Sequence, residues 1–254
     1  MRIRTVVLGT AFAGLLASAL CTRDSRGQSP DDDEIYWELQ PQALRDAPCP
    51  FDMVFVTGMG VCIDRYEWPN KYCVRPKVDA SGLREGHIKK DETHDADTLC
   101  KNVGKRVCQI EEWVAACRGP DNARYPWGNR TPRGKELRFE NEGKLPCSFN
   151  KEYRPVSSET KVWKRDPEIM KHLDQSEPAG HRESCRSAVG AYDMTGNAEE
   201  WVRCPGVAKS GWCLMGRFWS QLYPCDKAVK GHHPRWHYYT TGFRCCADLE
   251  EGED

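Results

Sequence analysis

The sequence predicts an irregular α+β domain that is rich in loops and stabilised by disulfide bonds. Three observations lead to this fold class. The chain of 254 residues contains 14 cysteines, a density typical of proteins that fold in an oxidising compartment. Short strand-like runs alternate with short helical segments. Residues 121–190 are rich in Pro, Gly, Asn and charged residues and have few apolar runs, so cross-links or bound ions would have to order them.

Composition and charge exclude several classes of protein. The net charge is −1 and the pI is about 6.7, whereas a nucleic-acid-binding chain normally carries a basic excess. Charged residues make up 30% of the chain and the mean hydropathy is −0.72, which excludes a polytopic membrane protein. Aromatic residues make up 10%, which argues against a mainly disordered chain.

The N-terminal segment has the pattern of an export signal. Arg2 and Arg4 precede an uncharged, mostly apolar run over residues 6–20, which is too short to span a bilayer comfortably. Ala17-Ser18-Ala19 forms an A-x-A cleavage motif. We therefore expect a signal peptide over residues 1–19 and an exported protein of the periplasm, the cell surface or the extracellular space, without a transmembrane segment.

Charge and composition set the other boundaries. Residues 20–48 are polar and acidic and predict a linker. The folded domain is expected over residues 49–248, and residues 249–254 form an acidic tail. Lipid attachment at Cys21 is an alternative mode of anchoring, but Leu20 is larger than the small residue that a lipobox places before its cysteine.

The predicted elements are short. Gly58-Met59-Gly60 separates two apolar runs, as in a β-hairpin. Gly119 follows the better of two helical segments and should end it. Residues 77–97 are charged and predict a loop. The predicted strands are 53–56, 61–67, 213–219 and 240–246, and the predicted helices are 97–102 and 110–118.

Three polar clusters could carry chemistry, and each has a structural alternative. The three histidines over residues 232–237 supply imidazoles of the kind that bind metals, or they cover a surface. Glu111-Glu112 could act as an acid–base pair, but adjacent helical carboxylates point to different faces, which favours a helix N-terminal role. The turn over residues 193–200 gathers carboxylates and carbonyls that suit Ca²⁺, or it is a capped turn that leads into Trp201.

Six further segments form a specific set because of their order along the chain. They are residues 62–67 (CIDRYE), 104–107 (GKRV), 112–119 (EWVAACRG), 125–129 (YPWGN), 190–202 (GAYDMTGNAEEWV) and 242–246 (GFRCC). With these segments, the chain resembles the formylglycine-generating-enzyme family, also called the sulfatase-modifying factor family. The resemblance covers roughly residues 49–248 and is closest to the cysteine-rich exported branch found in bacteria.

The resemblance implies a fold and a disulfide pattern. The family fold is an irregular variant of the C-type-lectin fold with two small sheets. The family pattern implies two bridges that each close a long loop, worth about 4 kcal/mol apiece in the chain-entropy model. These two bridges are Cys100 with Cys245 and Cys117 with Cys225. The turn residues between Cys204 and Cys213 suggest a bridged hairpin, and Cys49 with Cys62 is a further expected pair.

The resemblance also implies calcium. In the family, the turn that corresponds to residues 193–201 binds a structural Ca²⁺ through two side chains and two backbone carbonyls. A second family site uses an asparagine, for which Asn141 and Asn150 are both candidates. The ligands implied at the first site are Asp193, Gly196, Ala198 and Glu200.

The catalytic motif of the family has no match in this chain. The family's enzymes oxidise a substrate cysteine to formylglycine with O₂ and Cu(I), and two cysteines hold the copper, since thiolates are natural Cu(I) ligands. Residues 215–225 contain one cysteine, Cys225, which is already assigned to a bridge. Cu(I) is therefore not expected, and Cys213 with Cys225 is the only alternative catalytic pair.

Two functions follow from these observations. The missing cysteine pair favours an exported formylglycine-generating-enzyme-like domain without oxidase activity, which acts as a binding module or an envelope-associated structural module. The alternative is a divergent copper- and O₂-dependent formylglycine-generating oxidase that acts on sulfatase cysteines. A binding module would take a peptide, protein or glycan ligand, not nucleic acid, on an aromatic surface. The expected groove residues are Trp212, Trp219, Tyr223, His232, His233 and Trp236.

Overall fold

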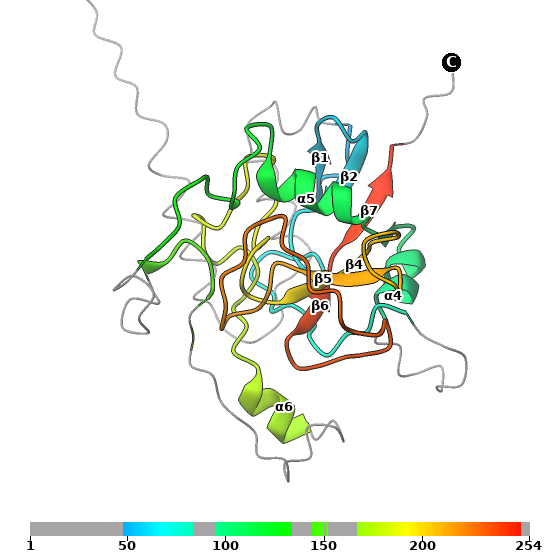
Figure 1. The fold of residues 1–254 in the computed structure, drawn as a ribbon, viewed down its shortest axis with the longest axis vertical. Coiled ribbons are helices and arrows are strands. Elements are labelled where there is room, and N and C mark those ends of the chain that lie inside the picture. Colours follow the sequence, from blue (N-terminus) through cyan, green and yellow to red (C-terminus); the bar gives the residue numbers. More distant parts are fainter. Residues whose placement is uncertain (1–47, 84–94, 134–143, 150, 152–166, 250–254) are drawn as a thin grey trace, which may run out of the picture. The chain divides into compact units, whose positions relative to one another are not determined.

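Two small β-sheets and three short helices make up the regular structure of the described residues (Figure 1). This computed structural model describes residues 48–83, 95–133, 144–149, 151 and 167–249. The elements in chain order are β1 (Met53–Val56), β2 (Val61–Asp64), α4 (Ala96–Asn102), β3 (Arg106–Val107), α5 (Ile110–Arg118), α6 (Pro167–Leu173), β4 (Glu199–Arg203), β5 (Trp212–Met215), β6 (Thr241–Phe243) and β7 (Cys245–Asp248). Irregular segments join them, so the predicted irregular α+β class is confirmed.

The first sheet has the strand order β1-β2-β7-β3, and all neighbouring strands are antiparallel. Strands β1 and β2 form the predicted hairpin, with Met53 opposite Asp64. The hairpin turn contains Gly58 and Gly60, whose φ angles of 85° and 66° suit a residue without a Cβ atom. Helix α5 lies beside the hairpin in Figure 1, and apolar side chains of both belong to one core cluster.

The second sheet has the order β5-β4-β6, in which β4 pairs antiparallel with β5 and parallel with β6. Its strand β5 is shorter than the predicted strand over 213–219, because the chain turns at Gly216, where φ is 75°. The predicted strand over 240–246 is divided at Arg244, so that β6 joins the second sheet and β7 the first. The side chain of Arg244 is fully buried at this crossing point.

Helix α5 has the bounds that the sequence predicts. Gln109 and Glu112 form a capping box at its start, and Glu112 also accepts hydrogen bonds of 2.8 and 2.6 Å from Arg106. Gly119 ends the helix with a φ of 62°. Glu112 therefore has the helix N-terminal role that the sequence favoured over an acid–base pair.

The other two helices differ in how well the sequence anticipates them. Helix α4 begins one residue before the predicted range, and the carboxylate of Asp95 caps it by accepting a hydrogen bond from the backbone N–H of Thr98 at 2.8 Å. Helix α6 was not predicted, because it lies within the stretch over 121–190, where the few apolar runs indicated no element. Leu173 at its end is buried against Trp219 and Tyr239, and this tertiary contact orders a helix of only seven residues.

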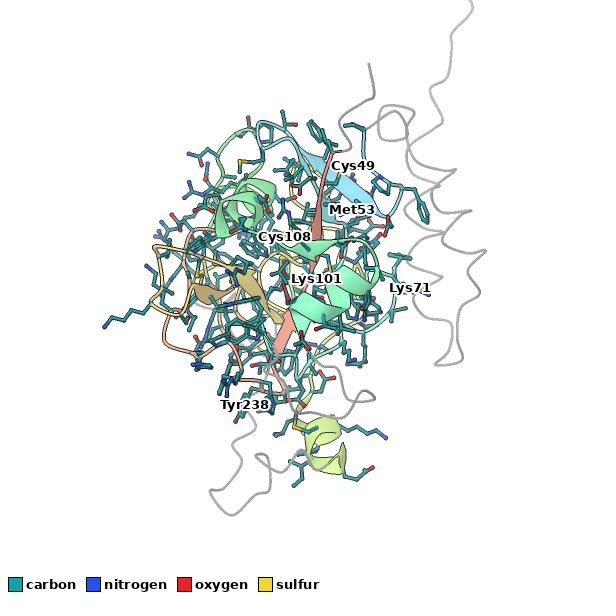
Figure 2. All side chains as sticks on the ribbon, turned by 90° about the vertical axis from the view of Figure 1, so that its right-hand side faces the viewer. Cys49, Met53, Lys71, Lys101, Cys108 and Tyr238 are labelled. Carbon is teal, nitrogen blue, oxygen red and sulfur yellow. A yellow bond between two sulfur atoms is a disulfide. The ribbon has the colours of Figure 1, made fainter. Side chains whose placement is uncertain are left out.

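Disulfide bonds join distant segments throughout the described part of the chain, and Figure 2 draws them as yellow bonds. All four expected pairs are present, and two further pairs were not anticipated, Cys108–Cys246 and Cys147–Cys185. Cys73 is also disulfide-bonded, and no described cysteine is free. The expected pairs are Cys49–Cys62, Cys100–Cys245, Cys117–Cys225 and Cys204–Cys213.

Several sequence predictions fall outside the described residues. They are the signal peptide over 1–19, most of the linker over 20–48, lipid attachment at Cys21, the calcium candidates Asn141 and Asn150, and all but the first residue of the tail over 249–254. Among the residues that the structure does describe, no helix has the length and apolar character needed to cross a membrane.

Candidate functional site

An open pocket of about 530 Å³ lies beside the second sheet, between the segment that follows β5 and the segment that precedes β6. We call it the aromatic pocket. Tyr238, one of its wall residues, lies at the opposite end of the domain from Cys49 and Met53 of the hairpin region (Figure 2). The pocket is lined by Lys151, Glu199, Arg217, Phe218, Ser220, Gln221, His232, Trp236, Tyr238, Tyr239 and Thr240.

The floor of the pocket contains a buried carboxylate. Glu199 begins β4 and is only 2% exposed. One of its oxygens accepts a hydrogen bond from the hydroxyl of Thr240 at 2.8 Å, and the other accepts one from Nη1 of Arg217 at 3.1 Å. Burial raises the pKa of Glu199, and the charge of Arg217 and both hydrogen bonds oppose that rise. The carboxylate is thus held in place rather than open to a ligand.

Arg217 presents its remaining donors to the pocket. The turn at Gly216 gives Arg217 a φ of 59°, and its guanidinium lies about 5 Å from the ring centres of Phe218 and Tyr223, at 5.0 and 5.1 Å. Nε and Nη2 both donate to the single oxygen Oε1 of Gln221, at 3.0 and 2.8 Å. The side chain of Arg217 is therefore positioned on one side by Glu199 and on the other by a neutral amide.

Stacked rings form one wall of the pocket. The centres of the His232 and Trp236 rings are 3.7 Å apart, and the rings are inclined by 14°. Trp236 in turn stacks on Tyr238 at 5.6 Å. Burial lowers the pKa of His232, and the charge of Arg217 lowers it further, so His232 is neutral at pH 7. The wall is an uncharged aromatic face of the same pocket that the guanidinium of Arg217 lines.

A second pocket of about 470 Å³ adjoins the first, because Ser220 and Gln221 line both. Its wall contains Tyr125 and Phe149, and a ladder of stacked rings runs from Tyr125 through Trp127 to Phe149, with ring centres 4.9 and 6.0 Å apart. Together the two pockets form a groove with two lobes along residues 217–223.

The structure divides the six predicted groove residues. His232 and Trp236 line the aromatic pocket, and Tyr223 lines the second pocket. Trp212 and Trp219 are corrections, because they are 2% and 1% exposed and belong to core clusters, where Trp212 packs edge-on against Trp201. The sixth, His233, is exposed, and its Nδ1 accepts a hydrogen bond from the backbone N–H of Arg235. It lines neither pocket.

Replacing Trp219 and Trp236 separately should distinguish core from pocket. Trp219→Ala should lower the free energy of unfolding by about 3–5 kcal/mol, because it removes a fully buried indole. Trp236→Ala should cost less than about 1.5 kcal/mol, since its ring is only partly buried at the pocket wall. Urea unfolding followed by far-UV circular dichroism measures both. An equal decrease in the free energy of unfolding for the two variants would show that Trp236 is a core residue and not part of the accessible pocket wall.

The alternative catalytic pair is also a correction. Cys213 is bonded to Cys204, and Cys225 is bonded to Cys117. Both sulfurs are therefore consumed in structural bridges to different partners. Among the described residues no thiol remains that could ligate Cu(I).

The turn predicted to bind calcium lies next to a buried ion pair. Glu200 accepts hydrogen bonds from Nε and Nη2 of Arg244, each at 2.7 Å, and from the indole N–H of Trp113 at 2.7 Å. The side chains of Glu200 and Arg244 are 1% and 0% exposed. Any cation bound by this carboxylate would lie beside a guanidinium.

The other implied ligands do not complete a calcium site in this arrangement. Asp193 accepts a hydrogen bond of 2.7 Å from the backbone N–H of Gly180, and burial raises the pKa of Asp193 to about 7. Binding through Asp193, Gly196, Ala198 and Glu200 would require the pair with Arg244 to open. Because the residues as placed do not fit Ca²⁺, calcium stays a prediction from the resemblance, and no step of the function depends on it.

Sequence reasoning assigned no role to Glu67, which holds this turn together. Its carboxylate is fully buried and accepts hydrogen bonds from the side-chain amide of Asn197 at 2.6 Å and the backbone N–H of Ala198 at 2.9 Å. Burial, together with the charges of Asp193 and Glu200, raises the pKa of Glu67 well above its usual range. The signal available was an acidic residue at the end of the predicted strand over 61–67, because a buried position there is costly unless the carboxylate has buried donors.

The three histidines over residues 232–237 do not converge on a metal. His237 pairs with Asp79 at 2.7 Å, and the other two face Trp236 and Arg235. Within the described ranges, one group of metal-ligand residues is close enough to share an ion: Cys108, Glu112 and Cys246. The two cysteines of that group are bonded to each other, so the surface alternative for the histidines stands.

The fold and the pocket define a class of protein: a disulfide-linked α+β domain with two small sheets and a ligand-sized groove beside the second. A model of the sulfatase-modifying factor enzyme 1-like domain matches residues 92–249, more than half of the chain. The chain therefore belongs to this family, as the six ordered segments implied.

Solved structures show a distant likeness. The crystal structure of CarF is 14% identical, with a TM-score of 0.43, and the match covers 75% of this chain and 87% of CarF. The Treponema denticola variable protein 1 is 13% identical, with a TM-score of 0.40, and the match covers 80% of this chain and 93% of that protein. No curated protein matches the sequence significantly. At these values neither structure carries a conclusion about function.

Proposed function

We propose that this chain is an exported member of the sulfatase-modifying factor family that binds a ligand in the aromatic pocket and does not oxidise cysteine. The observation that carries the proposal concerns the segment from β5 to Cys225. Its two cysteines, Cys213 and Cys225, lie in separate disulfides, while the residues from Arg217 to Tyr223, apart from the core residue Trp219, line the two-lobed groove. The groove is therefore retained without a thiolate pair.

The disulfides also support export. Six bridges and the bonded Cys73 account for every cysteine of the described ranges. Bridges of this number persist in oxidising compartments and are rare in a reducing cytosol. An envelope-associated or extracellular binding role agrees with this chemistry.

Copper and thiol measurements test the absence of oxidase activity. The exported protein, denatured without reductant, should release no free thiol to a thiol-specific reagent. The native protein should not bind one equivalent of Cu(I) tightly and should not convert a C-x-P-x-R peptide to its formylglycine form. A stoichiometric Cu(I) complex together with peptide conversion would overturn the proposal in favour of the divergent oxidase.

A further inference from the structure

In the aromatic pocket, two donors of Arg217 are bonded to a neutral amide oxygen that a charged acceptor could replace. Nε and Nη2 of Arg217 form the planar fork that binds a carboxylate through two parallel hydrogen bonds. Here the fork shares one oxygen of Gln221, a neutral and exposed side chain. Because Gln221 is on the surface, it can move away at little cost, and a ligand carboxylate would supply two charged oxygens in its place.

The charges around the pocket favour an anion. Arg217 and Lys151 are the cationic groups that line it, and Glu199 is the anionic group. Glu199 is already bonded to Arg217 and Thr240. Lys151 pairs with Glu177 at 2.8 Å, outside the pocket lining, but Glu177 also pairs with Arg182 at 2.6 Å, so one carboxylate serves two cations there. With a neutral His232, the lining carries one positive charge in excess, so a single negative group would balance it.

The aromatic wall of the pocket suits a ligand ring with a non-polar face. The stacked rings of His232, Trp236 and Tyr238 form an extended aromatic wall of the pocket, and the C–H face of a sugar packs well on the exposed part of such a wall. Ser220 and Gln221 provide hydroxyl and amide groups on the ridge between the two lobes. The second lobe, with Tyr125 and Phe149, offers another aromatic wall for an adjoining sugar unit.

We propose that the groove binds an acidic saccharide, with the carboxylate of a hexuronic acid on Arg217 in place of Gln221 and the sugar ring against the aromatic wall of His232, Trp236 and Tyr238. This inference rests on the proposed binding function and adds the chemical class of ligand. The carboxylate determines selectivity, and the aromatic walls supply contact area.

Titration with defined sugars tests the assignment. Intrinsic tryptophan fluorescence and calorimetry would compare methyl glucuronide with methyl glucoside, and short oligogalacturonides with galacto-oligosaccharides of the same linkage and length, as the neutral counterparts. The uronic acids should bind at least about tenfold more tightly than the neutral sugar, since hydrogen bonds to a charged acceptor are worth about that factor or more. Equal binding of neutral and acidic sugars would overturn the inference.

Three variants test the role of Arg217, one by removing its donors and two by changing Gln221, the acceptor that the ligand would displace. Arg217→Met should weaken uronate binding about tenfold to a hundredfold. Gln221→Glu should abolish binding while keeping the arginine, because its own carboxylate would occupy the fork. Gln221→Ala should bind as tightly as the natural chain or a few times more tightly. Wild-type affinity in Arg217→Met or in Gln221→Glu would contradict the proposed site.

Two controls separate this inference from the function on which it rests. Arg203→Met removes an arginine that lies over Trp212, 4.6 Å from its ring centre, and does not line either pocket. It should leave affinity unchanged. N-acetylphenylalanine provides a carboxylate with a ring but no sugar. Its binding in place of uronates would overturn the saccharide assignment and preserve the binding function, whereas tight Cu(I) binding with peptide conversion would overturn the proposed function itself.

Discussion

Replacing Glu200 with glutamine should lower the free energy of unfolding by about 3–5 kcal/mol, because it leaves the buried charge of Arg244 without its counter-ion. Glu200 accepts three hydrogen bonds, two of them from Arg244. A glutamine offers one oxygen, and its amide group would face a donor. Urea unfolding monitored by tryptophan fluorescence gives the loss.

An exposed ion pair provides the matched control. Asp97→Asn breaks the contact with Lys101 on α4, where the lysine side chain is 65% exposed. That change should cost less than about 0.5 kcal/mol. A loss as small as this for Glu200→Gln would contradict the view that the buried pair joins the two sheets.

The same variant tests calcium. If Glu200 serves Arg244 and Trp113 alone, the loss is the same in the presence of Ca²⁺ and in the presence of a chelator. If Glu200 also binds Ca²⁺, the natural chain is more stable with the ion, and the loss is larger there. That second result would show that the ion pair opens to admit the metal.

Removing two neighbouring disulfides together should unfold the protein, whereas removing either one should not. Cys245 and Cys246 are adjacent, and their partners Cys100 and Cys108 are close in sequence. While one bridge remains, the other closes a ring on the order of ten residues, worth about 3 kcal/mol in the chain-entropy model. When one of the two bridges has already been removed, the remaining bridge closes a larger ring, which is completed by Cys117–Cys225 and contains on the order of 40 residues. Removing this last bridge therefore lowers the free energy of unfolding by about 4 kcal/mol more.

The measurement compares three sets of alanine variants without reductant. Cys100→Ala with Cys245→Ala, and Cys108→Ala with Cys246→Ala, should each remain folded. All four changes together should cost about 7 kcal/mol, close to the whole stability of many domains. Cys204→Ala with Cys213→Ala, which opens a nine-residue separation, is the control and should cost about 2.5 kcal/mol. A fourfold variant that folds with a loss under about 3 kcal/mol would contradict the model.

The sequence predicted the elements whose signals are local. Helix 110–118 carries its own cap and its own glycine stop, and the hairpin carries its turn. Helix α6 was missed because Leu173 gains its stability from Trp219, which lies far along the chain. The break at Arg244 was missed for a similar reason. Its cause is a carboxylate on another strand, Glu200, and no local pattern reveals that partner.

The site was only partly predictable. His232 and Trp236 were identified by residue type, and both line the pocket. Trp219 was included for the same reason and is a core residue, because the residue type alone does not tell whether a tryptophan faces the core or the pocket. Arg217 and Gln221 were considered only as part of the missing copper motif. The hydrogen bonds from Arg217 to Gln221 and to Glu199 depend on the turn at Gly216, which the sequence pattern did not reveal.

The position of β6 and β7 in the chain has a consequence for biogenesis. Strand β7 lies between β2 and β3, and β6 completes the second sheet, yet both follow every other element in the order of synthesis. Until residues 241–248 emerge, Cys100 and Cys108 have no partners and both sheets have gaps. Cys100 and Cys108 can therefore form their native bridges only once this segment is available, and until then their sulfurs are free to exchange with those of other cysteines.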